Sequence, residues 1–152
     1  MTIETGDRAP ALILPTDGSA TTDLTDRVSV VYFYPKDDTS GCTREGLDFT
    51  ALGDAFAAAG CQVIGVSKDS LLAHAKFRAK HGLGVLLAAD LDGTACEAWG
   101  VWIEKSMYGR KYMGIERATF LVARDGSVAR AWHKVKVPGH AAEVLAAARA
   151  LG

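Results

Sequence analysis

Hydrophobic residues gather in short continuous runs near the start of the chain and are spaced more widely after each run. Residues 28–34 read VSVVYFY, and such a run of β-branched and aromatic residues is typical of a central strand that is buried on both faces. Residues 43–60 are rich in Ala and Leu, and their apolar positions predict a helix that ends at Gly60. A buried strand followed by a helix is the first unit that the pattern predicts.

The rest of the pattern continues the alternation of strands and helices and then predicts two consecutive strands before a final helix. We expect a strand at 62–67, a helix at 70–80, a strand at 85–89, a short helix at 92–99, strands at 118–123 and 128–133, and a final helix at 140–151. The last two strands are joined by RDGS, which predicts a hairpin. This order indicates an α/β protein with a thioredoxin-like fold, in which a central mixed sheet has helices on both faces. Segment 11–24 precedes that core and is expected to add an N-terminal β-hairpin.

Composition narrows the class of protein. A length of 152 residues suits a single domain over 1–152 with a proper core. The net charge is −1, so no basic field attracts nucleic acid, and we expect no such partner. The sequence also lacks a basic leader and any apolar stretch long enough to span a bilayer, so we expect a cytoplasmic protein without a membrane partner.

The chain has three cysteines, Cys42, Cys61 and Cys96. An odd number without a secretion signal argues against a framework of structural disulfides, and we expect free thiols in a reducing compartment. The four histidines form no cluster with zinc spacing, so we expect no metal site and interpret them as solvated or capping side chains.

Cys42 is the strongest candidate for chemistry. It lies in PKDDTSGCTRE, residues 35–45, where a strand and a loop lead into a helix. The free N–H groups and positive dipole of a helical first turn favour a thiolate over a thiol. Thr39 and Ser40 are good N-cap residues, and Pro35 fixes the direction of the loop and is expected to shield one side of the sulfur. The alternative is a small, deeply buried apolar residue, which the polar neighbours disfavour.

The stretch resembles a known family. The spacing Pro35-x-x-x-Thr39-x-x-Cys42 is similar to the peroxidatic signature of peroxiredoxins, and YFYPKDDTSGCTREGLDF resembles their bacterioferritin-comigratory, or Q-type, subgroup. The resemblance extends over nearly the whole chain. It includes GDRAPALILPTDG, CQVIGVSKDS, GIERATFLVARDG and WHKVKVPGHAAEVL.

The resemblance implies a thiol peroxidase for antioxidant defence. Cys42 would reduce hydrogen peroxide and organic hydroperoxides to water or alcohols and become a sulfenic acid. Thr39 would bind the peroxide, Arg117 would stabilise the sulfur and the moving charge, and Glu45 would orient Arg117. This sulfur chemistry requires no metal, flavin or haem. Without the resemblance, Arg117 would be interpreted as a surface charge and Glu45 as a solvated acid.

The chain departs from the subgroup at its resolving cysteine. Many members carry that thiol at the position of Leu47, and others at the position of Arg78, so the usual internal disulfide is in doubt. Cys61, at the far end of the predicted helix, is expected to be structural. The default is a one-cysteine cycle in which glutathione, a glutaredoxin or thioredoxin reduces the sulfenic acid, and over-oxidation of Cys42 becomes easier. The alternative is an atypical Cys42–Cys96 disulfide, which requires local unfolding.

A third interpretation, in which the protein is not an enzyme, stays open beside these two peroxidase cycles. A thioredoxin-fold redox sensor or holdase would react slowly with peroxide and would not turn over. The combination of Thr39 and Arg117 counts against it, because a passive binder needs neither. A disulfide reductase is disfavoured because Cys-x-x-Cys is missing. The resemblance suggests a monomer, or at most a dimer.

Overall fold

The computed structural model describes residues 2–18 and 20–151. Its main sheet has five strands in the order β3-β2-β1-β6-β7. They are β1 (Val28–Phe33), β2 (Cys61–Ser67), β3 (Leu86–Ala89), β6 (Ala118–Val122) and β7 (Val128–Trp132). The pairs β1–β2 and β2–β3 are parallel, and β1–β6 and β6–β7 are antiparallel. The predicted central mixed sheet is therefore confirmed.

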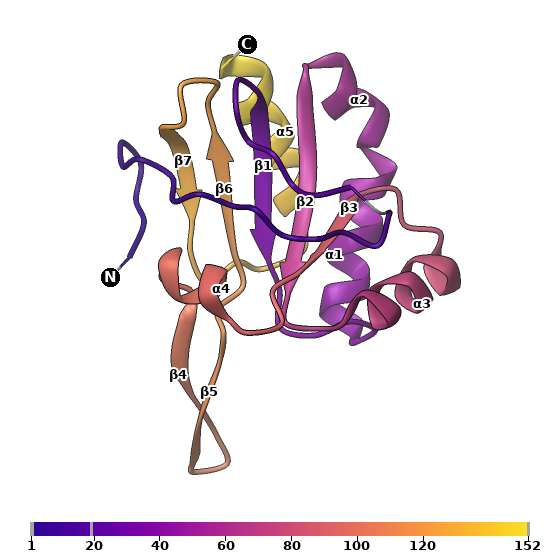
Figure 1. Cartoon of the computed structure of the whole chain (residues 1–152), viewed down its shortest axis with the longest axis vertical. Coiled ribbons are helices and arrows are strands. Elements are labelled where there is room, and N and C mark those ends of the chain that lie inside the picture. Colours follow the sequence, from indigo (N-terminus) through magenta and orange to yellow (C-terminus); the bar gives the residue numbers. More distant parts are fainter. Residues whose placement is uncertain (1, 19, 152) are drawn as a thin grey trace.

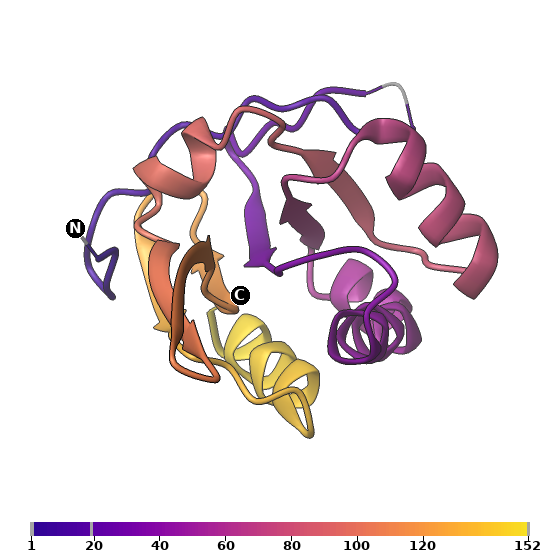
Figure 2. The same cartoon turned by 90° about the horizontal axis from the view of Figure 1, so that it is seen from below.

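The helices cover both faces of this sheet. They are α1 (Ser40–Ala51), α2 (Gly53–Ala58), α3 (Leu71–His81), α4 (Thr94–Ala98) and α5 (His140–Leu151). Helices α1, α2 and α5 pack on one face, while α4 and the N-terminal segment cover the other, and α3 lies beside β3 (Figures 1 and 2). The layers produce two separate apolar clusters.

Alternate residues of β1 divide between the two clusters. Val30 and Tyr32 face the cluster on the side of α1, whereas Val31 and Phe33 face the cluster on the side of α4. All four side chains are buried. The continuous apolar run of β1 thus serves both layers, as expected of a central strand.

The helix predicted over 43–60 differs from the structure at three points. It begins earlier, at Ser40, is interrupted at Leu52, and its second part ends at Ala58. Leu52 has φ −96° and ψ 9°, which is not helical, and it precedes Gly53, a weak helix former. Two shorter helices therefore replace the single long helix that was predicted.

A β-hairpin that the sequence did not predict projects from the body of the molecule (Figure 1). Its strands are β4 (Trp102–Met107) and β5 (Arg110–Ile115), and they form a separate two-stranded sheet. Tyr108 and Gly109 at the turn both have positive φ, 53° and 78°, as a tight type I′ turn requires. The pattern was missed because the strands are largely exposed and the turn lacks the usual Asn-Gly or Asp-Gly pair.

The N-terminal hairpin expected over 11–24 is reduced to an isolated bridge between Pro15 and Thr21. Another isolated bridge joins Thr16 to Ala88 of β3. Thr22 takes part through its hydroxyl, which accepts from the Leu14 N–H at 2.8 Å and donates to the Leu12 carbonyl at 2.8 Å. The segment is held as an irregular strap along the sheet, and residue 19 lies outside the described residues.

Candidate active site

Cys42 is the third residue of α1, directly beyond the loop that follows β1. Thr39 occupies the N-cap position with extended backbone, and its carbonyl accepts the first helical bond from the Thr43 N–H at 2.8 Å. The Thr39 side chain makes no capping hydrogen bond. The first turn of α1 therefore keeps backbone N–H groups that favour a negative charge close to Cys42.

The sulfur is more buried than its polar sequence neighbours suggested. Cys42 is 2% exposed and belongs to the apolar cluster beneath α1. The expectation that polar neighbours keep it out of the core was wrong, because α1 turns Cys42 and Glu45 inward and, of its charged residues, only Arg44 and Asp48 toward the surface.

Arg117 approaches Cys42 from a distant part of the chain. It lies between β5 and β6, and its Nη2 donates to the Cys42 Sγ at 3.4 Å. Its Nη1 donates to the Glu45 Oε1 at 2.7 Å. Gly41 makes this approach possible, since a Cβ there would lie 3.1 Å from the Arg117 Nη2. The guanidinium thus bridges the sulfur and a carboxylate from the same helix.

Burial controls the charges of this cluster. Glu45 is 1% exposed, and the loss of hydration raises its pKa to about 7 against the opposing effect of Arg117. Its Oε2 has no hydrogen-bond partner among the described residues. Burial lowers the pKa of Arg117, but the charges of Glu45 and Cys42 outweigh burial and hold the pKa above its usual value. Arg117 is therefore a permanent cation beside the sulfur.

Thr39 and Pro35 take less direct positions. Both are exposed, and the Thr39 hydroxyl donates to the Lys36 carbonyl at 2.9 Å. The structure brings Cys42, Arg117 and Glu45 together, and it places Thr39 at the start of the same helix with its hydroxyl turned to the loop. Pro35 lies at the surface, two residues after Phe33, where β1 ends.

Lys105 is a charged residue near the active site that the sequence pattern did not indicate. It lies on β4, and its pKa is lowered first by burial and then by the charge of Arg117, with Cys42 and Glu116 acting in the opposite direction. Its side chain crosses Gly114 of β5, where a Cβ would lie 3.2 Å from the Lys105 Cδ. The signal was hidden because the β4–β5 hairpin itself was not predicted.

The two other cysteines have different surroundings. Both are buried and free. Cys96 lies on α4 and belongs to the cluster on the opposite face of the sheet from Cys42. Cys61 begins β2, and burial raises its pKa to about 11. Among residues 2–18 and 20–151, no cation is hydrogen-bonded to either of these thiols as Arg117 is to Cys42.

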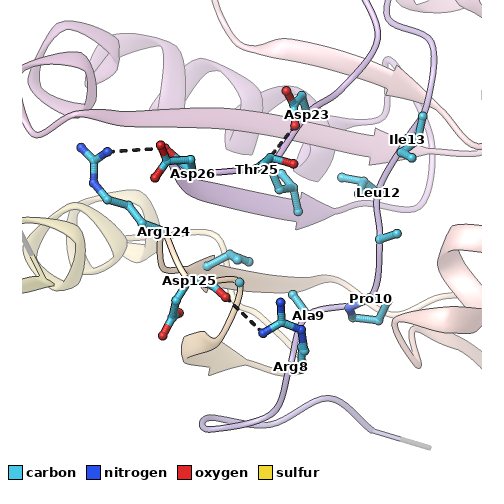
Figure 3. A pocket seen from close by; sticks show the side chains of 14 residues that line it. Arg8, Ala9, Pro10, Leu12, Ile13, Asp23, Thr25, Asp26, Arg124 and Asp125 are labelled. Carbon is cyan, nitrogen blue, oxygen red and sulfur yellow. Dashed lines mark hydrogen bonds between the residues drawn. The ribbon is translucent and has the colours of Figure 1, made fainter.

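A pocket of about 400 Å³ lies far from Cys42, at the amino end of β1 (Figure 3). Its two arginines are already engaged: Arg8 donates to the Asp125 carbonyl at 3.1 Å, and Arg124 donates to the Asp26 carbonyl at 3.4 Å. Its lining includes neither cysteine nor histidine. The pocket therefore offers neither a thiol nor an imidazole for catalysis.

The structure adds two observations on metals and membranes. Over residues 2–18 and 20–151, no group of three His, Cys, Asp or Glu side chains is placed to hold a metal ion. In the same ranges no helix is both long and apolar enough to cross a bilayer.

The chain is similar to known proteins over most of its length. Residues 5–131 match the model of the AhpC/TSA family. Peroxiredoxin Bcp of Bacillus subtilis is 47% identical over 148 residues, which cover 95% of this chain and 94% of the relative. Peroxiredoxin Bcp of Xanthomonas campestris is 54% identical over 121 residues, which cover 80% of this chain and 76% of the relative.

Solved structures agree with these sequence matches. A structure of Xanthomonas campestris peroxiredoxin Q has a TM-score of 0.89 at 46% identity, with 97% of each chain covered. A structure of the bacterioferritin comigratory protein of the same organism, from work on its alkyl peroxide reduction activity, has a TM-score of 0.87 at 45% identity. That match covers 95% of this chain and 98% of the other.

Proposed function

This chain belongs to the AhpC/TSA family and is a peroxiredoxin, a thiol-dependent peroxidase, and from that premise we propose that it works by a one-cysteine cycle at Cys42. The peroxidase substrates are hydrogen peroxide and organic hydroperoxides. The unit that acts is a single domain of residues 1–152, a cytoplasmic monomer, with a dimer as the alternative.

The chemistry begins at the sulfur. The Cys42 thiolate attacks one peroxide oxygen, a sulfur–oxygen bond forms, and the oxygen–oxygen bond breaks. Sulfur is oxidised to the sulfenic acid, and the leaving oxygen takes a proton and departs as water or an alcohol. Arg117, 3.4 Å from the sulfur, stabilises the thiolate and then the charge that moves onto the leaving oxygen.

Thr39 and Glu45 complete the site. The Thr39 hydroxyl donates to the Lys36 carbonyl, and its oxygen still has a lone pair that can accept the peroxide O–H. Glu45 fixes the direction of Arg117 through the 2.7 Å ion pair. Pro35 limits the freedom of the loop that carries Thr39.

The observation that carries the one-cysteine cycle is the separation of the thiols by the sheet. Cys42 and Cys96 lie in clusters on opposite faces, whereas a disulfide needs Cα atoms within about 7 Å of each other. The position of the subgroup's other resolving thiol is occupied by Arg78. Its guanidinium binds both Asp17 carboxylate oxygens at 2.5 and 2.9 Å, and the Leu83 and Val85 carbonyls at 2.6 Å each.

An external thiol therefore completes the cycle. A thiolate of glutathione, a glutaredoxin or thioredoxin attacks the sulfenic sulfur and forms a mixed disulfide with Cys42, while the oxygen takes a proton and leaves as water. A second reductant thiol then attacks the mixed disulfide, which releases the Cys42 thiolate and leaves the reductant as a disulfide. Because no internal disulfide forms quickly, a second peroxide can oxidise the sulfenic acid to the sulfinic acid.

Turnover measurements test this proposal. Peroxide consumption is followed with each reductant for the wild type, Cys42→Ser and Cys96→Ser. We expect no turnover from Cys42→Ser and wild-type turnover from Cys96→Ser with at least one reductant. Loss of turnover in a folded Cys96→Ser variant would establish the Cys42–Cys96 cycle instead. Failure of the wild type with every donor would favour a redox sensor or holdase.

A further inference from the structure

A buried ion pair lies next to the active-site loop and takes no part in the chemistry above. Asp37, in the loop between β1 and α1, is 9% exposed, and His74 of α3 is 0% exposed. The Asp37 Oδ2 and the His74 Nδ1 are 2.6 Å apart. The Tyr34 hydroxyl donates to the other carboxylate oxygen, Oδ1, at 2.6 Å.

The hydrogen-bond partners fix the charge of His74. Its Nε2 lies 2.9 Å from the Ala88 carbonyl oxygen, which can only accept, and its Nδ1 faces a carboxylate oxygen. Both ring nitrogens therefore carry hydrogen, and the ring is an imidazolium. Burial lowers the pKa of His74, but the hydrogen bond and charge of Asp37 outweigh burial and leave the pKa above its usual value.

Further polar groups close the network around the pair. The Asp69 Oδ2 accepts from the Asp37 N–H at 2.9 Å and from the Ser67 hydroxyl at 2.7 Å. The charge of Asp69 also favours the imidazolium of His74, and the Tyr34 ring lies 6.5 Å from the His74 ring. Each hydrogen-bonding atom of the Asp37 carboxylate and the His74 ring has a partner.

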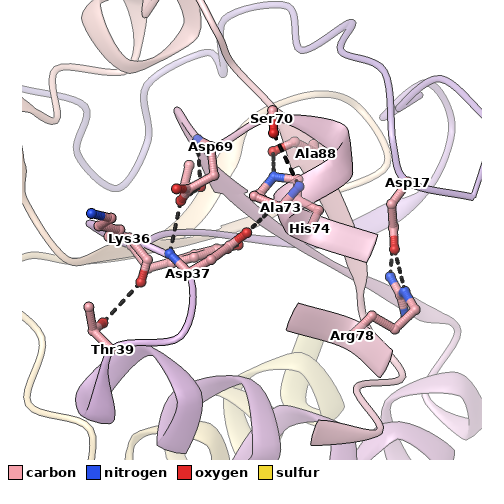
Figure 4. Close-up of polar contacts among 12 residues, drawn as sticks. Asp17, Lys36, Asp37, Thr39, Asp69, Ser70, Ala73, His74, Arg78 and Ala88 are labelled. Atoms are coloured by element: carbon pink, nitrogen blue, oxygen red, sulfur yellow. Dashed lines mark hydrogen bonds and ion pairs between the residues drawn. The ribbon is translucent and has the colours of Figure 1, made fainter. Parts of the chain in front are cut away.

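This network holds the loop at several neighbouring points. Asp38 has a φ of 60°, and its carboxylate binds Lys80 and His81 of α3 at 2.8 Å each. The next residue is Thr39, whose hydroxyl donates back to the Lys36 carbonyl (Figure 4). Helix α3 thus fixes a short loop that ends at the N-cap of α1, three residues before Cys42.

We propose that Asp37 and His74 are positioning residues for the peroxidase reaction, which hold Thr39 and the first turn of α1 in the geometry that receives the peroxide. This inference rests on the proposed function, in which Thr39 binds the peroxide. When the imidazolium is lost, a buried carboxylate is left without its counter-charge and the loop must move to hydrate it.

The direction of the pH effect follows from the raised pKa of His74. The pair stabilises the loop fully below the ordinary histidine pKa of 6.5, and this stabilisation is lost as the pH rises through the folded-state pKa. The rate of the peroxide step should therefore fall at alkaline pH as His74 of the Asp37–His74 pair loses its charge.

Two variants separate geometry from charge. Asp37→Asn can keep every bond: its carbonyl accepts from Tyr34, its amide donates to a neutral Nδ1, and Nε2–H still donates to the Ala88 carbonyl. His74→Leu removes both ring bonds and leaves Asp37 unpaired. Val144→Ala, in the buried face of α5, is the control for a loss of stability that does not touch the loop.

The experiment measures the single-turnover rate of Cys42 oxidation by hydrogen peroxide, followed by tryptophan fluorescence in the full chain below the unfolding temperature of every variant. We expect His74→Leu to be about 10- to 100-fold slower, the usual effect of a displaced reacting group. Asp37→Asn should remain within about threefold of wild type and should lose the alkaline decline. Val144→Ala should keep the wild-type rate.

The Thr39→Val background tests whether the pair acts through Thr39. There, His74→Leu should slow the reaction by less than about threefold, because residues that act as a unit are not additive. The proposal is overturned if folded His74→Leu reacts at the wild-type rate, or if its loss is equally large in both backgrounds. If Thr39→Val alone leaves the rate unchanged, the proposed role of Thr39 fails, and the pair is then judged by the contrast between His74→Leu and Asp37→Asn.

Discussion

Cys42 and Cys96 occupy the same place in two different helices. Each is the third residue of its helix, α1 or α4, and each is buried, at 2% and 0% exposure. The charged groups next to them are opposite. The Arg117 guanidinium donates to the Cys42 sulfur, whereas the Asp90 carboxylate lies at the start of α4 beside Cys96.

Asp90 occupies the backbone N–H groups at the start of α4, which would otherwise stabilise a thiolate there. Its Oδ2 accepts from the Cys96 N–H at 2.8 Å, and its Oδ1 accepts from the Ala95 N–H at 3.1 Å. Burial raises the pKa of Cys96, and the hydrogen bond and charge of Asp90 raise it further. Helix position and burial therefore do not distinguish a reactive cysteine from an inert one in this fold, and the neighbouring charge does.

Replacing Arg117 with Met removes the positive charge next to Cys42, which is the main difference between the surroundings of Cys42 and Cys96. We expect the second-order rate with hydrogen peroxide to fall by about 10²- to 10³-fold, the usual cost of losing a preorganised donor at a developing charge. Stopped-flow fluorescence measures this rate. Arg124→Met, at an exposed arginine far from Cys42, is the matched control and should change little. A loss smaller than about threefold in the folded Arg117→Met variant would remove the guanidinium from the account.

Thr39→Val removes the hydroxyl at the start of α1 and keeps the shape of the side chain. A hydrogen bond to a charged group is worth about 1.5–3 kcal/mol, and charge develops on the peroxide as its oxygen–oxygen bond breaks, so the peroxide rate should fall by about 10- to 100-fold. Thr94→Val makes the same change in the first turn of α4 and should leave the rate unchanged. Equal rates for the two variants would mean that Thr39 does not bind peroxide.

Glu45→Gln tests whether the buried Glu45 carboxyl, which binds Arg117 beside Cys42, takes up a proton as the pH falls. The folded-state pKa of about 7 lies above the ordinary value of 4.5, so between these values the folded protein holds a proton that the unfolded chain has lost. Stability therefore falls as the pH rises from 4.5 to 7, by about 2–3 kcal/mol, and the Gln variant should lack this loss.

Urea unfolding at pH 5 and pH 7.5 measures the effect for both proteins. The stability that His74 contributes also starts to fall once the pH rises above the ordinary histidine pKa of 6.5, because its folded-state pKa is raised, but this happens in both proteins, so their difference isolates Glu45. A difference that stays constant with pH would show that the carboxylate is ionised throughout.

Asp90→Asn should have the smallest effect. It removes the negative charge next to Cys96, but the thiol stays buried and gains no cation. We expect alkylation of Cys96 by iodoacetamide in the folded protein to rise by less than about tenfold and to remain far slower than that of Cys42. An unchanged rate would mean that burial alone restrains Cys96.

The sequence predicted the parts of this comparison that depend on local order. The run at β1 and the cap residues before Cys42 placed that cysteine at the start of a helix, and the alternation of elements predicted the mixed sheet. Arg117 lies 75 residues from Cys42, so its approach followed only from the family resemblance. Local pattern cannot encode a contact that depends on how β5 and β6 are arranged in space.

Burial was the property that the sequence predicted least well. His74 was interpreted as a solvated or capping side chain, which was wrong, because it lies in the interior between Asp37 and the Ala88 carbonyl. The prediction that Cys42 is not deeply buried was also wrong, for a related reason. In both cases a polar side chain is buried because a partner from another element compensates its charge, and that partner is not a sequence neighbour.

The most direct test of the central claim, that the charge beside each thiol decides which one reacts, is peptide mapping after less than one equivalent of hydrogen peroxide in the presence of dimedone. We predict the dimedone adduct of a sulfenic acid on Cys42, with Cys96 and Cys61 recovered as free thiols. An adduct on Cys96, or a disulfide between Cys42 and Cys96 in the folded protein, would contradict the account.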